Sequence, residues 1–176
     1  GTDAPVFLYV GSGYARKGVA TLLQAASRMT HGEARFCIIG IDKNAETYKK
    51  LARALGVHEK VFFLGGQSDV SPYLGTADAF VLPTIYEPLS NAVLEALASG
   101  LPVVTTTACG AAELIRQGVN GYVFEAGDAH TLSLHLDALA EQGVARSMRD
   151  AARASVAHLT THAMAENLIR LYRSLM

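Results

Sequence analysis

Short apolar runs alternate with helix-length amphipathic segments over the first two thirds of the chain. Apolar runs of four or five residues bounded by glycine, proline or polar residues are typical of buried parallel strands. The predicted strands are 6–10, 35–39, 61–64, 79–82, 102–105 and 121–124. The predicted helices between them are 17–29, 45–55, 70–74, 90–99 and 111–116. The alternation predicts an α/β fold: a Rossmann-like, doubly wound parallel sheet in three αβα layers.

The last third of the chain has only helical periodicity. Asp128 is placed to cap a helix over 129–142, and further helices are predicted over 144–158 and 161–176. With 176 residues, 50% of them hydrophobic, the chain can bury one full core. We expect 1–5 to be a linker or a cloning remnant and 6–176 to be a single domain.

The charge balance limits the classes of partner. Fifteen Lys plus Arg against 16 Asp plus Glu exclude a general nucleic-acid-binding surface, so any phosphate binding must be local. Cys37 and Cys109 have no zinc-site spacing and are expected to be reduced thiols. Because no apolar run reaches the roughly 18 residues of a membrane span, a soluble, cytoplasmic protein is expected.

Glycines and charged residues follow the predicted strands. In a doubly wound sheet the carboxyl ends of the strands meet at one edge, where ligands bind. That edge should collect residues from all the successive loops: Gly11, Gly13, Arg16, Lys17, Gly40, Asp42, Gly65, Gly66, Gln67, Glu87 and Gly110.

Arg16 and Lys17 are predicted to lie in the first turn of a helix. Cations there oppose the helix dipole by a few tenths to about 1 kcal/mol each, unless an anion lies between them and the helix end. The preceding loop, 11–18, fits neither the dinucleotide fingerprint nor a Walker loop. A diphosphate therefore explains the pair, and the alternative is that both are solvated surface charges.

Two glutamates flank the start of the helix predicted over 90–99. Pro88 makes Glu87 extended, Ser90 is a suitable N-cap, and Glu95 falls in the second turn as the only charge of an apolar helix. We expect Glu95 to be buried and to need a partner. Alone, Glu87 could equally be a surface acid beside a turn.

The chemistry of this segment suits a sugar nucleotide. Carboxylates accept hydrogen bonds from vicinal hydroxyls such as those of ribose or a hexose. The amides of Leu89, Ser90 and Asn91 are free donors for a phosphate or sugar oxygen. Together with the cations, these groups predict a nucleotide-sugar site.

These residues also carry a family resemblance. Glu87, seven residues, Glu95 and then Ala-Leu-Ala-Ser-Gly-Leu-Pro-Val-Val resemble the signature of retaining glycosyltransferases of family four (group 1), of the two-domain GT-B class. Val10-Gly11-Ser12-Gly13, Gly40-Ile41-Asp42-Lys43, Phe63-Leu64-Gly65 and Ala111-Ala112-Glu113-Leu114-Ile115 resemble the family in the same order. Ser12 stands where many members carry arginine, which leaves Arg16 as the diphosphate arginine. This variant is most similar to glucosyltransferases of the lipopolysaccharide core.

The resemblance implies a role for each residue. Arg16 and Lys17 would hold the diphosphate, Glu95 the ribose, and Glu87 with the 89–91 amides the transferred hexose. The turn over 66–68, which includes Gln67 and Ser68, would contact the base. Because no Asp-x-Asp sequence occurs, the resemblance implies a metal-free enzyme without a cofactor, with UDP-glucose the favoured donor.

The resemblance also implies partners. A GT-B enzyme binds its glycan or lipid-linked acceptor largely through a first domain, which 6–176 does not include. We therefore expect an inactive donor-binding half, peripheral to the inner membrane only through that other domain. Two alternatives stay open: an NAD(P)-binding Rossmann module with Asp42 as its ribose acid, and a non-catalytic nucleotide-sugar-binding module.

Overall fold

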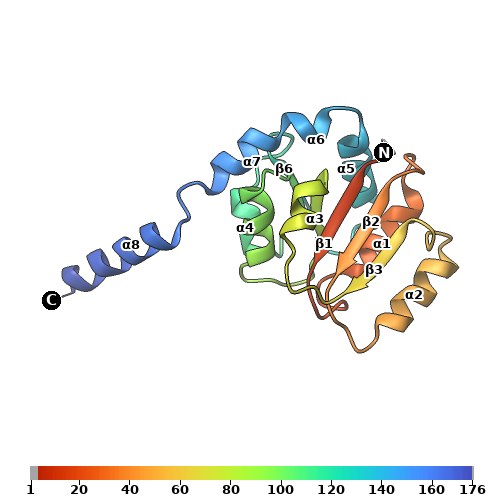
Figure 1. Cartoon of the computed structure of the whole chain (residues 1–176), viewed down its shortest axis with the longest axis horizontal. Coiled ribbons are helices and arrows are strands. Elements are labelled where there is room, and N and C mark those ends of the chain that lie inside the picture. The colour runs from red at the N-terminus through yellow and green to blue at the C-terminus, as the bar shows by residue number, and fades with distance from the viewer. Residues whose placement is uncertain (1–3, 176) are drawn as a thin grey trace.

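A computed structural model describes residues 4–175, and its centre is a six-stranded, all-parallel sheet (Figure 1). The strand order is β3-β2-β1-β4-β5-β6. The strands are β1 (Val6–Val10), β2 (Arg35–Ile39), β3 (Val61–Gly65), β4 (Ala79–Leu82), β5 (Val103–Thr106) and β6 (Gly121–Phe124). The order reverses between β1 and β4, so the prediction of a doubly wound sheet is confirmed. Most of the predicted linker, 1–5, lies outside the described residues.

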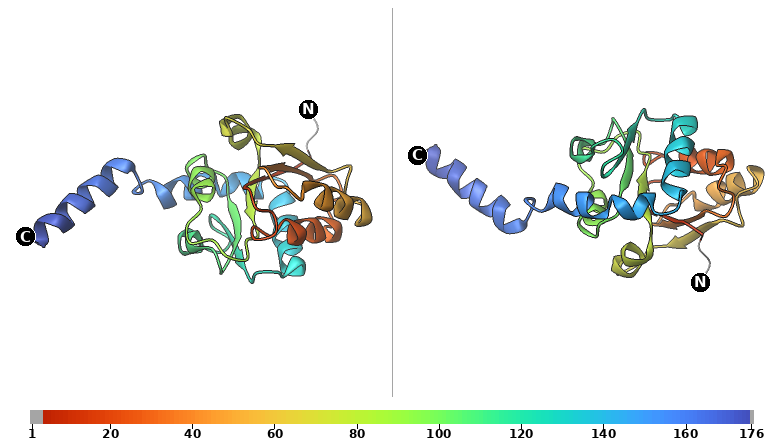
Figure 2. Two further views of the ribbon diagram at one scale, coloured as in Figure 1. Left: turned by 90° about the horizontal axis from the view of Figure 1, so that it is seen from below. Right: turned by 90° about the horizontal axis from the view of Figure 1, so that it is seen from above.

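Helices cover both faces of the sheet. They are α1 (Val19–Arg28), α2 (Ala45–Ala54), α3 (Ser71–Thr76), α4 (Asn91–Ala98), η1 (Gly110–Leu114), α5 (Ala129–Ala140), α6 (Val144–Ser147), α7 (Arg149–Val156) and α8 (Thr161–Ser174). α1 packs against α2 and α5, and α4 packs against α7. α3 lies in front of the sheet in Figure 1 and α1 behind it, and the turned views of Figure 2 separate these layers. The core between them is fully apolar at β4, where Ala79, Phe80, Val81 and Leu82 are all 0% exposed.

Three predicted helices differ from the observed ones. The helix expected from residue 17 begins at Val19, because Gly18 has a left-handed backbone (φ 74°) that a helix cannot contain. The segment predicted over 111–116 is the 3₁₀ helix η1, and Ile115 is already extended. The helix predicted over 144–158 is divided at the buried residue Met148, which ends α6 and precedes α7.

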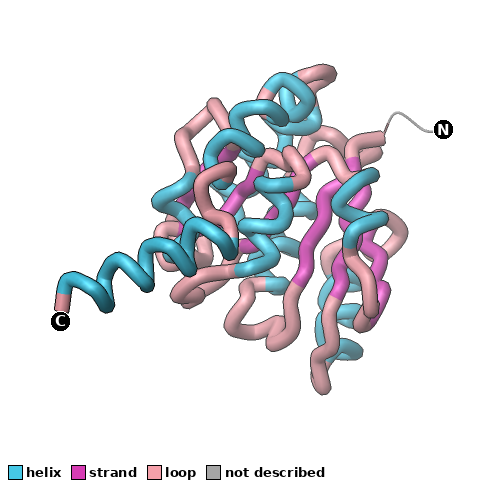
Figure 3. The backbone as a smooth tube through the Cα atoms, turned by 60° about the vertical axis from the view of Figure 1, so that its left-hand side comes forward, coloured by secondary structure: helices cyan, strands magenta, loops and turns pink. Residues whose placement is uncertain are grey.

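Helix α8 projects from the rest of the molecule, as Figures 1 and 3 show. None of its side chains is buried. Met164, Leu168, Leu171 and Tyr172 recur at helical spacing and are 44–64% exposed. Within the described part of the chain, no helix is both long and apolar enough to cross a membrane.

The chain crosses itself very closely at the carboxyl edge of the sheet. A Cβ atom added at Gly18 would lie 1.8 Å from the carbonyl oxygen of Pro83. At Gly110 it would lie 1.9 Å from the carbonyl oxygen of Pro88, and at Gly40 it would lie 2.0 Å from that of Gly11. Only glycine fits these positions, so the loops after β1, β2, β4 and β5 are held in contact there.

The Gly18 crossing can be tested by substitution. Gly18→Ala should destabilise the chain more than Gly56→Ala. The two glycines have similar backbones (φ 74° and 71°), but an added Cβ atom would have a neighbouring atom within 4 Å at Gly18 and none at Gly56. We expect Gly56→Ala to lower the free energy of unfolding by about 1 kcal/mol. Gly18→Ala should lose a further ~1–3 kcal/mol through overpacking. Urea denaturation measures both, and equal losses would show that the crossing has no effect on stability.

Candidate functional site

Glu87 joins two cations at the point where the strand order reverses. Its Oε2 lies 2.9 Å from Nζ of Lys17 and 3.1 Å from Nη1 of Arg16. The side chains of Lys17 and Glu87 are only 14% and 12% exposed, whereas that of Arg16 is 50% exposed. Burial raises the pKa of Glu87, but hydrogen bonds and attraction from Lys17 and then Arg16 outweigh it and hold the pKa below its ordinary value.

The local backbone explains why these three side chains meet. Gly11 lets the Lys17 side chain pass over it, since a Cβ there would lie 2.6 Å from Cδ of Lys17. Arg16 is fixed to the β4 exit because its carbonyl accepts from the Ile85 amide (2.8 Å) and its guanidinium donates to the Tyr86 carbonyl (2.8 Å). On the other side, the Glu87 amide donates to the Ala108 carbonyl (3.1 Å).

The cations lie in the turn before α1, not in its first turn as predicted. The Lys17 amide donates to the Gly13 carbonyl (3.1 Å), and the helix begins only after Gly18. Gly13 is exposed, with φ +77°, and gives this turn its shape. The cations are therefore held by the turn, close to the helix N-terminus but outside its first turn.

The start of α4 presents unpaired donors. In the described part of the chain, no backbone hydrogen bond is made by the amides of Leu89, Ser90 or Asn91. Ser90 precedes the helix as predicted, but its hydroxyl makes no capping bond and is buried without a partner. A buried hydroxyl and free helix-terminal amides form a set of donors suited to an anionic or sugar oxygen.

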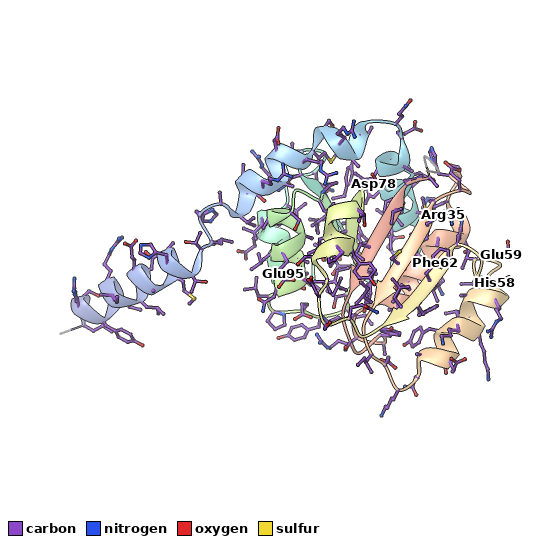
Figure 4. All side chains as sticks on the ribbon, in the orientation of Figure 1. Arg35, His58, Glu59, Phe62, Asp78 and Glu95 are labelled. Carbon is purple, nitrogen blue, oxygen red and sulfur yellow. The ribbon has the colours of Figure 1, made fainter. Side chains whose placement is uncertain are left out.

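The prediction that Glu95 is buried is wrong. Glu95 is exposed, because the buried stripe of α4 is formed by Val93, Ala96 and Leu97. Figure 4 labels Glu95 on this helix. It lines an open cleft of about 480 Å³ between α3 and α4, together with Ser68, Asp69, Val70, Ser71, Leu74, Ala98 and Ser99.

The predicted site residues therefore fall into two groups. Arg16, Lys17 and Glu87 are in direct contact over Gly11, whereas Glu95 and Ser68 share the cleft. Gln67 does not line the cleft, and its side-chain amide donates to the Leu64 carbonyl (2.7 Å).

Two further residues bear on the assignment. Both carboxylate oxygens of Asp42 are engaged, by the Tyr14 amide (2.7 Å) and the Asn44 amide (2.7 Å), which leaves Asp42 a structural role. Sequence reasoning missed Thr84, a fully buried polar residue two positions after the end of β4, following Pro83. A polar residue this close to a buried apolar run was the available signal.

The fold and this edge define the class of the protein. A doubly wound parallel sheet with cations and free helix-terminal amides at the point of strand reversal is the arrangement by which α/β domains bind phosphorylated ligands. The comparisons with known proteins then give the family. The family model described as glycosyl transferases group 1 matches residues 1–158, and the chain belongs to this family.

Curated relatives agree with the family assignment. The chain is 39% identical over 127 residues to the lipopolysaccharide core biosynthesis glycosyltransferase LpsE of Rhizobium meliloti (strain 1021), covering 72% of this chain and 37% of LpsE. It is 36% identical over 122 residues to the lipopolysaccharide glucosyltransferase WaaG of Escherichia coli (strain K12), covering 67% of this chain and 32% of WaaG. The chain therefore spans about a third of the length of these relatives.

Solved structures show the same fold. The crystal structure of WaaG superposes with a TM-score of 0.82 at 30% identity, covering 92% of this chain and 44% of that chain. The Anabaena HepE structure, in complex with UDP and glucose, superposes with a TM-score of 0.89 at 20% identity, covering 98% of this chain and 49% of that chain. At that identity the likeness to HepE shows the fold alone.

The ion pairs of Glu87 predict a change in its titration. Lys17→Met removes the cation 2.9 Å from Oε2, so the pKa of Glu87 should rise towards its ordinary value. A carboxylate with a depressed folded-state pKa contributes stability above its unfolded pKa and loses it as pH falls through the folded pKa. In Lys17→Met this contribution is smaller and is lost at higher pH. Carbon-13 NMR titration of the carboxyl groups measures the shift.

Lys49→Met is the matched control. Lys49 pairs with Glu46 at 2.6 Å on α2, away from the site, so its removal should raise the pKa of Glu46 and leave that of Glu87 unchanged. An unchanged Glu87 titration in Lys17→Met would contradict the role of Lys17.

Proposed function

We propose that this chain is the donor-binding half of a retaining GT-B glycosyltransferase that moves a hexose from a nucleotide sugar to a glycan or lipopolysaccharide-core acceptor. The observation that carries the proposal is the contact of Arg16, Lys17 and Glu87 beside the free amides of α4. Glucose is the favoured sugar, because the relative WaaG is named a lipopolysaccharide glucosyltransferase, and we propose UDP as its carrier.

Each group has a part in donor binding. Arg16 and Lys17 attract the diphosphate, and the amides of Leu89, Ser90 and Asn91 add neutral donors at the same edge. Because Glu87 already lies against both cations, a hexose attached to that diphosphate would come within reach of its carboxylate. In the transition state the cations and amides stabilise the charge that develops on the departing nucleoside diphosphate.

The cleft between α3 and α4 suits the nucleoside. Glu95 is exposed on one wall and can accept hydrogen bonds from the two ribose hydroxyls. Ser68 also lines this cleft, which supports a base position against the turn over 66–68. The nucleotide would then run from this cleft to the cations across the start of α4.

We propose that transfer needs neither a metal nor a cofactor. Among residues 4–175, no group of three or more His, Cys, Asp or Glu side chains is arranged to hold a metal ion. The charge of the leaving group is matched here by Arg16, Lys17 and the α4 amides instead.

A second domain would supply the acceptor site. The relatives are about three times as long as the segment they share with this chain, and α8 carries an apolar face that the described residues leave uncovered. Docking of that face against another domain of the same enzyme fits both observations. We place the enzyme in the cytoplasm, with any contact to the inner membrane made by that other domain.

Calorimetric titration with UDP tests the ribose assignment. Glu95→Ala should weaken UDP binding by about tenfold or more, the size expected for lost hydrogen bonds to a charged group. Glu113→Ala is the control, because Glu113 is also an exposed helical acid but lies on η1. Glu87→Ala should chiefly reduce the preference for UDP-glucose over UDP. Equal UDP affinities in wild type and Glu95→Ala would refute the assignment, and thermal stabilisation by NADH but not UDP-glucose would favour a dinucleotide-binding module.

The purified chain should bind donor but transfer no sugar. Incubation with UDP-glucose and a lipopolysaccharide-core acceptor, followed by mass spectrometry of the acceptor, should detect no added hexose. Transfer at the rate of an intact relative such as WaaG would show that the chain is catalytically complete.

A further inference from the structure

Thr84 is a buried polar residue between the two loops that carry the charges of the site. It lies two positions after the end of β4, following Pro83, and is 0% exposed. Its hydroxyl oxygen lies 3.1 Å from the carbonyl oxygen of Arg16 and 3.1 Å from the carbonyl oxygen of Tyr86. The single hydroxyl hydrogen is thus shared between the residue that carries one cation and the residue that precedes Glu87.

Other hydrogen bonds converge on the same point. The Ile85 amide donates to the Arg16 carbonyl (2.8 Å), and the Arg16 guanidinium donates to the Tyr86 carbonyl (2.8 Å). From the next strand, the buried hydroxyl of Thr106 donates to the Thr84 carbonyl (2.7 Å). The ends of β1, β4 and β5 are therefore connected through Thr84.

This connection bears on the distance between the Glu87 carboxylate and the cations of Arg16 and Lys17. The contacts of Glu87 with Lys17 and Arg16 span two loops that are more than sixty residues apart in the chain. The Gly18 crossing lets the two loops approach closely, because no side chain separates Gly18 from the Pro83 carbonyl. Attraction comes from the Ile85–Arg16 backbone bond, from the Arg16 guanidinium and from the Thr84 hydroxyl, which lies within hydrogen-bond distance of one carbonyl on each loop.

We propose that Thr84 is a positioning residue that fixes Arg16 and Lys17 relative to Glu87 and to the start of α4. Because Thr84 is 0% exposed, it cannot touch a bound donor, so it acts through the two loops. The inference rests on the proposed function for its effect on donor binding, but its effect on Glu87 is independent of any ligand.

Thr84→Val tests this role, since it keeps the branched shape and removes the hydroxyl. In the ligand-free chain, the pKa of Glu87, measured by carbon-13 NMR, should rise towards its ordinary value as the cations lose their fixed position. UDP affinity, measured by calorimetry, should fall roughly five- to tenfold, the effect of one lost hydrogen bond. Thr84→Ser restores the hydroxyl and should return both quantities to near wild type.

Thr105→Val is the matched control. Thr105 is also 0% exposed, and its hydroxyl donates to a backbone carbonyl, that of Leu82 (2.9 Å), but it connects strands instead of the charged loops. In urea denaturation, Thr105→Val should lower the free energy of unfolding as much as Thr84→Val does. The pKa of Glu87 and the affinity for UDP should stay at their wild-type values. Thr106→Val, which removes the bond to the Thr84 carbonyl, is the second test variant if Thr84→Val does not fold, and it should shift both quantities in the same direction.

The outcomes separate the two proposals. If Thr84→Val, or Thr106→Val in its place, matches Thr105→Val in both the Glu87 titration and UDP affinity, Thr84 has only a structural role and the inference is overturned. If the Glu87 titration shifts while the wild-type chain binds no UDP, the positioning role stands and the proposed function fails.

Discussion

The site depends on how closely the backbone packs at the carboxyl edge of the sheet. Gly18 lies against Pro83, and Gly110 lies against Pro88, so closely that a Cβ atom at either glycine would overlap a carbonyl oxygen. These two contacts flank the charged residues in sequence, because Lys17 precedes Gly18 and Glu87 precedes Pro88. Packing of uncharged backbone is therefore what brings the charges within ion-pair distance.

The close packing has an electrostatic consequence. One carboxylate is shared by two cations, so the edge keeps a net positive charge, to which the free amides of α4 add partial positive charge. Lys17 and Glu87 are largely shielded from water, which strengthens their interaction, whereas the half-exposed Arg16 contributes less because solvent screens it. An anionic ligand at this edge would compete with Glu87 for the same cations. Binding of the proposed donor is therefore coupled to the state of this carboxylate.

Much of the fold could be predicted from local sequence patterns. Four of the six strands, β1, β2, β4 and β6, have the predicted bounds, because a short apolar run between turn residues has few other conformations in an α/β chain. The predictions failed where neighbours in space decide the outcome. Gly18 has a left-handed backbone and lies against Pro83, and the segment after α5 is divided at the buried Met148. Pro83 is distant from Gly18 in the sequence, so no local pattern reports their contact.

The sequence by itself determined the order of the elements, the edge of the sheet at which the candidate site lies, and the residue types available there. These follow from periodicity and from the rule that parallel strands end on one side. Only the tertiary structure decided that Glu95 faces a cleft and is not buried, that Asp42 is occupied by backbone amides, and that Thr84 connects the charged loops. Burial and hydrogen bonding depend on which distant segments pack together. For each of these residues at least one partner comes from another segment of the chain, which a local sequence pattern does not report.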